Sequence, residues 1–190
     1  MTQKRTIIVA LAALLAGAAT AAVAWFASPQ QLPWTATAAQ PLWTETPWPF
    51  LTDEWGKGKA FRCSAADCGT EVNLYIRAKI GFCNCTTGVA DDAELERLSD
   101  FDLVGSDVTA LGDGRPIGVA WMKGRSRGYT LPGKNRPGKA ALSVAFNDRC
   151  DAVVATAVTA SDRPIAVEPA VIDFLNSKTV LRWAEVTLGL

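Results

Sequence analysis

Five cysteines are the residues of this chain whose types and spacing could do chemistry. Cys63 and Cys68 are separated by four residues, Cys83 and Cys85 form a C-x-C pair, and Cys150 stands alone. Thiolates in such groups could bind Cu(I) or Zn²⁺, exchange disulfides through the C-x-C pair, or close disulfides that stabilise a small domain. We expect structural disulfides, with thiol-based copper or zinc handling or disulfide exchange as the alternative. The members of a C-x-C pair are too close to bridge comfortably, so one of them should reach another cysteine, and an odd cysteine remains.

The other motifs that suggest chemistry lack the partners they need. The chain contains no histidine, so a G-x-S-x-G at residues 124–128 has no general base of the usual kind. A G-x-x-x-x-G-K at residues 128–134 is followed by Asn135 in place of Ser or Thr, and by Pro137 where a helix should begin. The acids of residues 91–113 do not follow the EF-hand spacing. We therefore predict no catalytic residue, metal or cofactor, with a carboxylate-based enzyme as a distant alternative.

An uncharged run at residues 6–27 directly follows Lys4 and Arg5. A helix of about 20 apolar residues crosses a bilayer, and the preceding cations favour a cytoplasmic start. This pattern predicts an N-terminal transmembrane anchor over residues 1–27, in a bacterial inner membrane, crossed once, with the rest of the chain in the periplasm. The alternative is a cleaved signal that releases the domain into the periplasm.

Residues 28–58 have the composition of a strap that links the anchor to a domain. They combine five prolines with aromatic side chains, among them Trp43, Trp48 and Trp55. Proline opposes regular helix and central strand, whereas a disordered tether would carry fewer aromatic residues. The strap is expected either to pack on its own domain or to contact a membrane or partner through these three tryptophans.

A second candidate contact surface is a basic hairpin rich in glycine and proline. Its cations could hold anionic lipid headgroups or an acidic protein partner, or could simply be solvated. They include Lys123, Arg125, Arg127, Lys134 and Arg136. Nucleic acid is not an expected partner, because the net charge is formally zero and the domain is predicted to be exported.

The remaining 59–190 segment is predicted to form one β-rich periplasmic domain. Alternation at residues 72–77 is typical of a strand, and Asp91 followed by acids predicts a capped helix start. Strands are predicted at residues 59–63, 71–78, 117–122, 140–146, 152–159 and 180–188, with a turn at 112–114 and helices at 91–98 and 169–176. This order favours a β-rich α+β fold: a small antiparallel sandwich or partly open barrel with two short helices.

The end of the chain resembles a known family. A strand, the segment Asp148-Arg149-Cys150-Asp151-Ala152, a second strand and a helix at 170–176 are similar to the ending of the invasion-associated locus B family. Phe61-Arg62-Cys63 resembles that family's first cysteine strand. The resemblance implies an exported bacterial protein with a small β-rich fold, paired cysteines, an accessory or interaction role and no catalytic residues.

The function expected from the sequence is therefore that of a membrane-anchored periplasmic domain. We expect it to bind a membrane or periplasmic protein partner, to be stabilised by disulfides, and to catalyse no reaction.

Overall fold

The computed structural model describes residues 41–81, 84–105, 107–131 and 139–190. The predicted anchor lies outside these residues, as do Cys83, Lys134 and Arg136. Among the described helices, none combines the length and apolarity needed to span a membrane.

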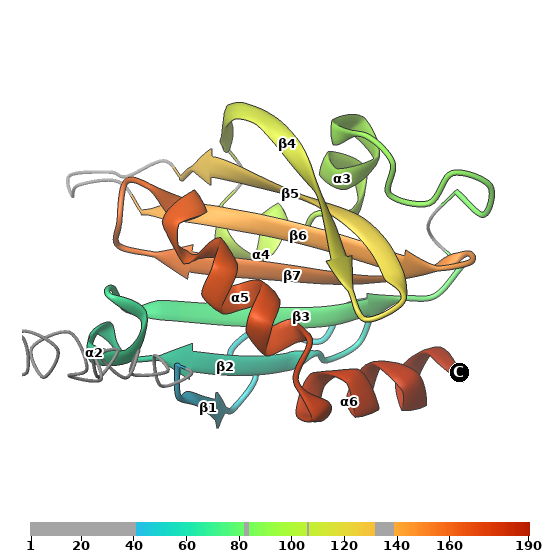
Figure 1. Ribbon diagram of the computed structural model, residues 1–190, viewed down its shortest axis with the longest axis horizontal. Helices are drawn as coiled ribbons and strands as arrows, with labels where there is room; N and C mark the ends of the chain where they lie inside the picture. Colours follow the sequence, from blue (N-terminus) through green and yellow to red (C-terminus); the bar gives the residue numbers. More distant parts are fainter. Residues whose placement is uncertain (1–40, 82–83, 106, 132–138) are drawn as a thin grey trace, which may run out of the picture. The chain divides into compact units, whose positions relative to one another are not determined.

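A seven-stranded antiparallel sheet forms the centre of the described domain, in the order β1-β2-β3-β7-β6-β5-β4 (Figure 1). The sheet is open, with β1 and β4 as its two edges. Its strands are β1 (Trp43–Thr46), β2 (Lys59–Cys63), β3 (Val72–Lys79), β4 (Thr109–Val119), β5 (Met122–Thr130), β6 (Ala140–Asp148) and β7 (Asp151–Thr159). The β-rich fold is thus confirmed. Of the predicted sandwich or partly open barrel, the sandwich is wrong, because the described strands join one sheet, which is not closed.

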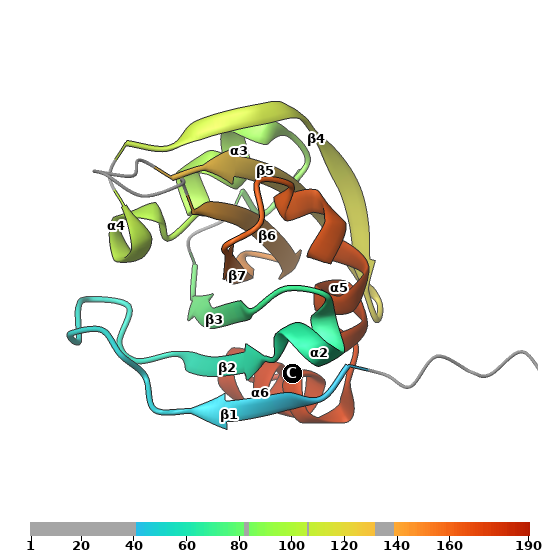
Figure 2. The same ribbon diagram turned by 90° about the vertical axis from the view of Figure 1, so that its left-hand side faces the viewer.

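Helices cover both faces of this sheet (Figure 2). On one face lie α5 (Glu168–Leu175) and α6 (Lys178–Leu188), preceded by the 3₁₀ turn η1 (Pro164–Val167). On the other face lie α3 (Asp92–Leu98) and α4 (Phe101–Val104), while the short α2 (Ala65–Cys68) follows β2. Two faces covered by helices explain why β6 and β7 are almost continuously buried.

The main core lies under α5 and α6. Alternate residues of β3, such as Leu74 and Ile76, pack there with Val171, Leu175 and Val180 from the helices. The intervening strand residues face α3 and α4, because successive strand residues point to opposite faces of the sheet. Leu95 and Leu98 of α3 meet Ala145 and Val154 in this second cluster.

The helix α3 confirms the predicted capped start, since the Asp91 carboxylate accepts from the backbone N–H of Glu94. The strand predicted at residues 180–188 is wrong, because this segment forms α6. Ser177 caps α6, and its buried residues Val180, Ala184 and Leu188 recur every four positions. Burial of these three residues against the sheet outweighs the strand preference of the β-branched residues in α6.

Two further local predictions are wrong. The turn expected at residues 112–114 lies inside β4, where the register with β5 shifts as in a β-bulge. The strand expected at residues 117–122 is interrupted, since Ala120 and Trp121 form the tight turn between β4 and β5. Ala120 adopts a positive φ of 51° there, which reverses the chain within two residues.

Candidate partner-binding surface

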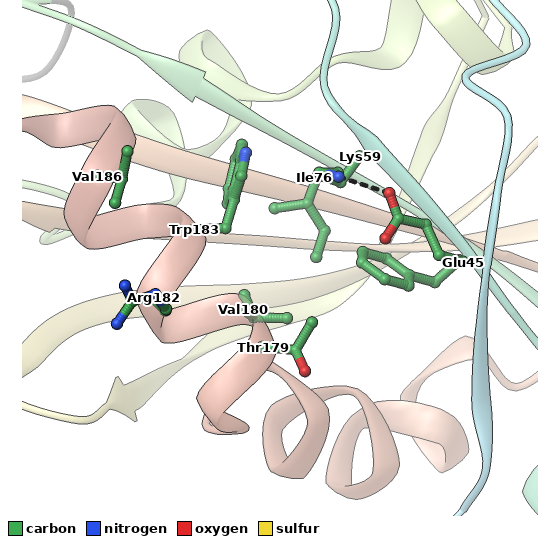
Figure 3. Close-up of a pocket in the computed structure, with 9 residues that line it drawn as sticks. Glu45, Lys59, Ile76, Thr179, Val180, Arg182, Trp183 and Val186 are labelled. Atoms are coloured by element: carbon green, nitrogen blue, oxygen red, sulfur yellow. Dashed lines mark hydrogen bonds and ion pairs between the residues drawn. The ribbon is translucent and has the colours of Figure 1, made fainter.

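A largely apolar groove runs beside α6. It has a volume of about 400 Å³ and lies between α6 and the β1–β2–β3 end of the sheet (Figure 3). We call it the α6 groove. It is lined by Glu45, Lys59, Phe61, Ile76, Thr179, Val180, Arg182, Trp183 and Val186. Apolar lining with few polar groups is typical of a binding site.

The groove follows from the way in which α6 sits on the sheet. Val180, Ala184 and Leu188 point into the core, so the next side chains around the helix project to its flank. Trp183 is half-buried on this flank, whereas Val186 is 75% exposed. The sheet supplies Phe61 and Ile76, both buried and both part of the main core. The partly exposed Trp183 and the largely uncovered Val186 therefore lie beside buried apolar side chains of the main core.

Charges lie only at the margin of the α6 groove. The Lys59 ammonium donates to the Glu45 carboxylate at 2.5 Å, across the β1–β2 pair. Arg182 is exposed on α6, and no carboxylate among the described residues lies within ion-pair distance of it. This arrangement can provide apolar contact with some charge selectivity. The lining residues include no nucleophile beside a base.

The strap tryptophans pack on their own domain in this structure. Trp43 stacks on Phe174 of α5, with ring centroids 4.8 Å apart. Trp48 lies edge-on to Tyr75 of β3 at 6.2 Å, and Phe50 joins the same cluster. Burial raises the pKa of the Tyr75 phenol. These contacts account for the aromatic composition of the described strap, while contact with a partner or lipid stays a prediction.

Trp55 lies beside a buried ion cluster that ties the strap to the sheet. The Lys79 ammonium stands 5.4 Å from its ring centroid and 2.8 Å from the Asp100 carboxylate. Arg77 donates from Nε and Nη2 to the two Asp100 oxygens at 3.1 and 2.5 Å, and from Nη1 to Asp53 at 2.5 Å. The hydrogen bond from Arg77 holds the pKa of Asp53 below its ordinary value. Because its members are mutually satisfied, we assign this cluster to structure.

The described cations of the predicted basic hairpin are largely compensated by α3. Arg125 donates from Nε to Asp92 at 2.7 Å, and Arg127 donates from Nη1 to Glu96 at 2.7 Å. The backbone N–H of Gly114 and then Arg125 lower the pKa of Asp92. Lys123 is exposed on β5. These acids are distant in sequence, so the pairing could not be read from the hairpin alone.

The G-x-S-x-G motif is a feature of sheet packing. Ser126 lies on β5, is fully buried, and donates its hydroxyl to Glu168 at 3.0 Å. Glu168 is also paired with Arg115. A side chain at Gly124 would bring a Cβ within 2.0 Å of the Ala145 carbonyl oxygen, so the close approach of β5 and β6 requires glycine there. The second half of the phosphate-loop motif, from residue 132, lies outside the described residues.

Two disulfides account for four of the cysteines: Cys63–Cys68 and Cys85–Cys150. Disulfides of this kind are those of an oxidising compartment, outside the cell or in the periplasm. The partner of Cys85 is therefore Cys150, one of the three that the spacing left open. A site of four thiolates, or exchange through Cys85, would first require these bonds to be reduced. Among the described residues, no cluster of three potential metal ligands is found.

Sequence reasoning missed the α6 groove because it assigned the last segment to a strand. The signal was present as Ser177 followed by apolar residues at 180, 184 and 188, which is a helix start and a helical period.

No protein-family model matches the chain, and a search of curated proteins finds no significant match.

Proposed function

We propose that the chain is a membrane-anchored periplasmic accessory domain that binds a protein partner through the α6 groove and catalyses no reaction. The α6 groove carries this proposal, because it leaves Val186 and part of Trp183 in contact with solvent beside the apolar core. The disulfides support the exported setting. The uncharged run at residues 6–27 supports a single anchor in a bacterial inner membrane. The resemblance to the invasion-associated locus B family points to the same kind of accessory role.

Structural reasons favour binding over catalysis at this position. The groove-lining side chains are mostly apolar, and the Glu45 carboxylate is neutralised by Lys59. Burial of an exposed valine and a half-buried tryptophan against a partner contributes about 25 cal/mol per Å² of apolar area. Such a groove suits the central anchor of an interface, with the surrounding charges as its rim.

Photo-crosslinking in native membranes tests the proposal. The full-length chain would carry p-benzoylphenylalanine at Val186 or, as a matched control, at Leu111. Both side chains are exposed and apolar, but Leu111 lies on β4, the opposite edge strand. We expect a discrete crosslinked protein from the Val186 position only. The crosslinked protein, once purified, should bind the unmodified chain and lose at least tenfold in affinity for V186D. Equal crosslinking at both positions, or unchanged affinity for V186D, would refute binding at the groove.

A further inference from the structure

We propose that the α6 groove selects a peptide segment in which an apolar side chain stands beside a carboxylate. This inference rests on the proposed function and adds the chemistry of the partner. The apolar side chain would pack on Phe61, Ile76 and Trp183, which line the groove. The carboxylate would meet Arg182 at the rim.

Arg182 differs from most arginines of the described domain. The side chains of Arg62, Arg77, Arg97, Arg115, Arg125 and Arg127 all form ion pairs within the chain. Arg182 lines the groove and has no such partner among the described residues. A guanidinium offers a planar fork of donors that matches a carboxylate in two parallel hydrogen bonds. Its position on the flank of α6 directs this capacity toward whatever fills the groove.

The remaining charges of the groove do not compete for the carboxylate. Lys59 is held by Glu45 at 2.5 Å, so this pair adds no net charge. Arg182 is therefore the uncompensated charge among the nine described lining residues. An acidic group on the partner completes the charge balance, whereas a basic group would be repelled.

A peptide fits this site better than the acyl chain of an anionic lipid. The Glu45–Lys59 pair lines the groove together with the apolar residues and is partly exposed, with side-chain exposures of 52% and 39%. A peptide backbone can donate to Glu45 and accept from Lys59 as it covers them. An acyl chain would remove water from both charges without replacing its hydrogen bonds.

Random-peptide selection against the full-length protein in detergent tests this specificity. We expect the selected peptides to combine Asp or Glu with an adjacent large apolar residue. The R182E variant should bind them about tenfold more weakly and should itself select Lys or Arg in place of the acid. K178E is the matched control: it reverses an exposed charge one turn earlier on α6 that does not line the groove, and should leave the preference unchanged.

A second variant separates this inference from the proposed function. Selected peptides that bind V186D less well than the wild type show binding in the groove. If such peptides contain no acid, or bind R182E as well as the wild type, carboxylate recognition is overturned while groove binding stands. Selected peptides indifferent to both V186D and R182E, or an absence of selected peptides, would overturn both proposals. An anionic lipid that co-purifies with the wild-type protein and is lost from R182E would overturn the peptide in favour of a lipid.

Discussion

Asp100 is predicted to be the most sensitive carboxylate of the buried ion cluster. It is 3% exposed, and it faces two cations, Arg77 and Lys79, that are 2% and 5% exposed. D100N keeps the shape of the side chain but leaves Asp53 as the one carboxylate of the cluster. Breaking a buried ion pair costs about 3–5 kcal/mol, because an uncompensated charge stays out of water. At about 2–4 °C per kcal/mol, the melting temperature should fall by roughly 10 °C.

Urea unfolding of the oxidised protein, followed by tryptophan fluorescence, measures this change. D102N is the matched control, since Asp102 lies in α4 next to Asp100 but is exposed. It should alter the free energy of unfolding by less than about 0.5 kcal/mol. A combined R77M/K79M/D100L variant should recover most of the loss, because apolar groups of similar volume need no ion partner. A D100N loss below about 1 kcal/mol would refute the view that the cluster is buried and coupled.

Two other measurements address the disulfides and the α3 ion pairs. Replacing Cys85 and Cys150 by serine should lower the free energy of unfolding by about 4 kcal/mol, and replacing Cys63 and Cys68 should lower it by about 2 kcal/mol. The difference arises because the first disulfide closes a loop of 65 residues and the second a loop of 5. Equal losses in urea unfolding would contradict this loop-entropy argument. The lowered pKa of Asp92 contributes stability that is complete above its ordinary pKa of 3.8 and is lost as the pH falls through the folded-state value. Melting temperatures across this acidic range should therefore fall less steeply for D92N than for the wild type, and parallel curves would exclude the Asp92 contribution.

The elements that could be predicted from the sequence are those whose local signals agree with their tertiary setting. The continuous apolar runs of β6 and β7 are typical of strands buried on both faces, and they form the centre of the sheet. Asp91 and the acids after it predict α3, whose first turn they complete. In these segments, propensity, capping and burial all favour one structure.

The sequence pattern was misleading where long-range contacts decide the structure. The alternation in β3 is typical of a strand with one face in solvent, but α4 and the strap cover its polar face and Arg77 is buried there. That burial depends on Asp53 and Asp100, which are 24 and 23 residues away in the chain. In α6, β-branched residues favour a strand locally, while packing on the sheet selects a helix. The burial of Arg77 is not encoded within a short window of residues, whereas the α6 helix is also signalled locally by Ser177 and the spacing of its buried residues.

The α6 groove itself can be traced to the two prolines that bound β1. Pro41 and Pro47 lie just outside a strand of four residues, and proline lacks the N–H that would extend its pairing with β2. Four strand residues span about 13 Å, whereas the eleven residues of α6 span about 16 Å. The register pairs β1 with residues 60–63 of its neighbour β2 and ends before Lys59, which lines the α6 groove. The same prolines that protect an edge strand from unwanted pairing therefore leave the flank of α6, with Trp183 and Arg182, open to a partner.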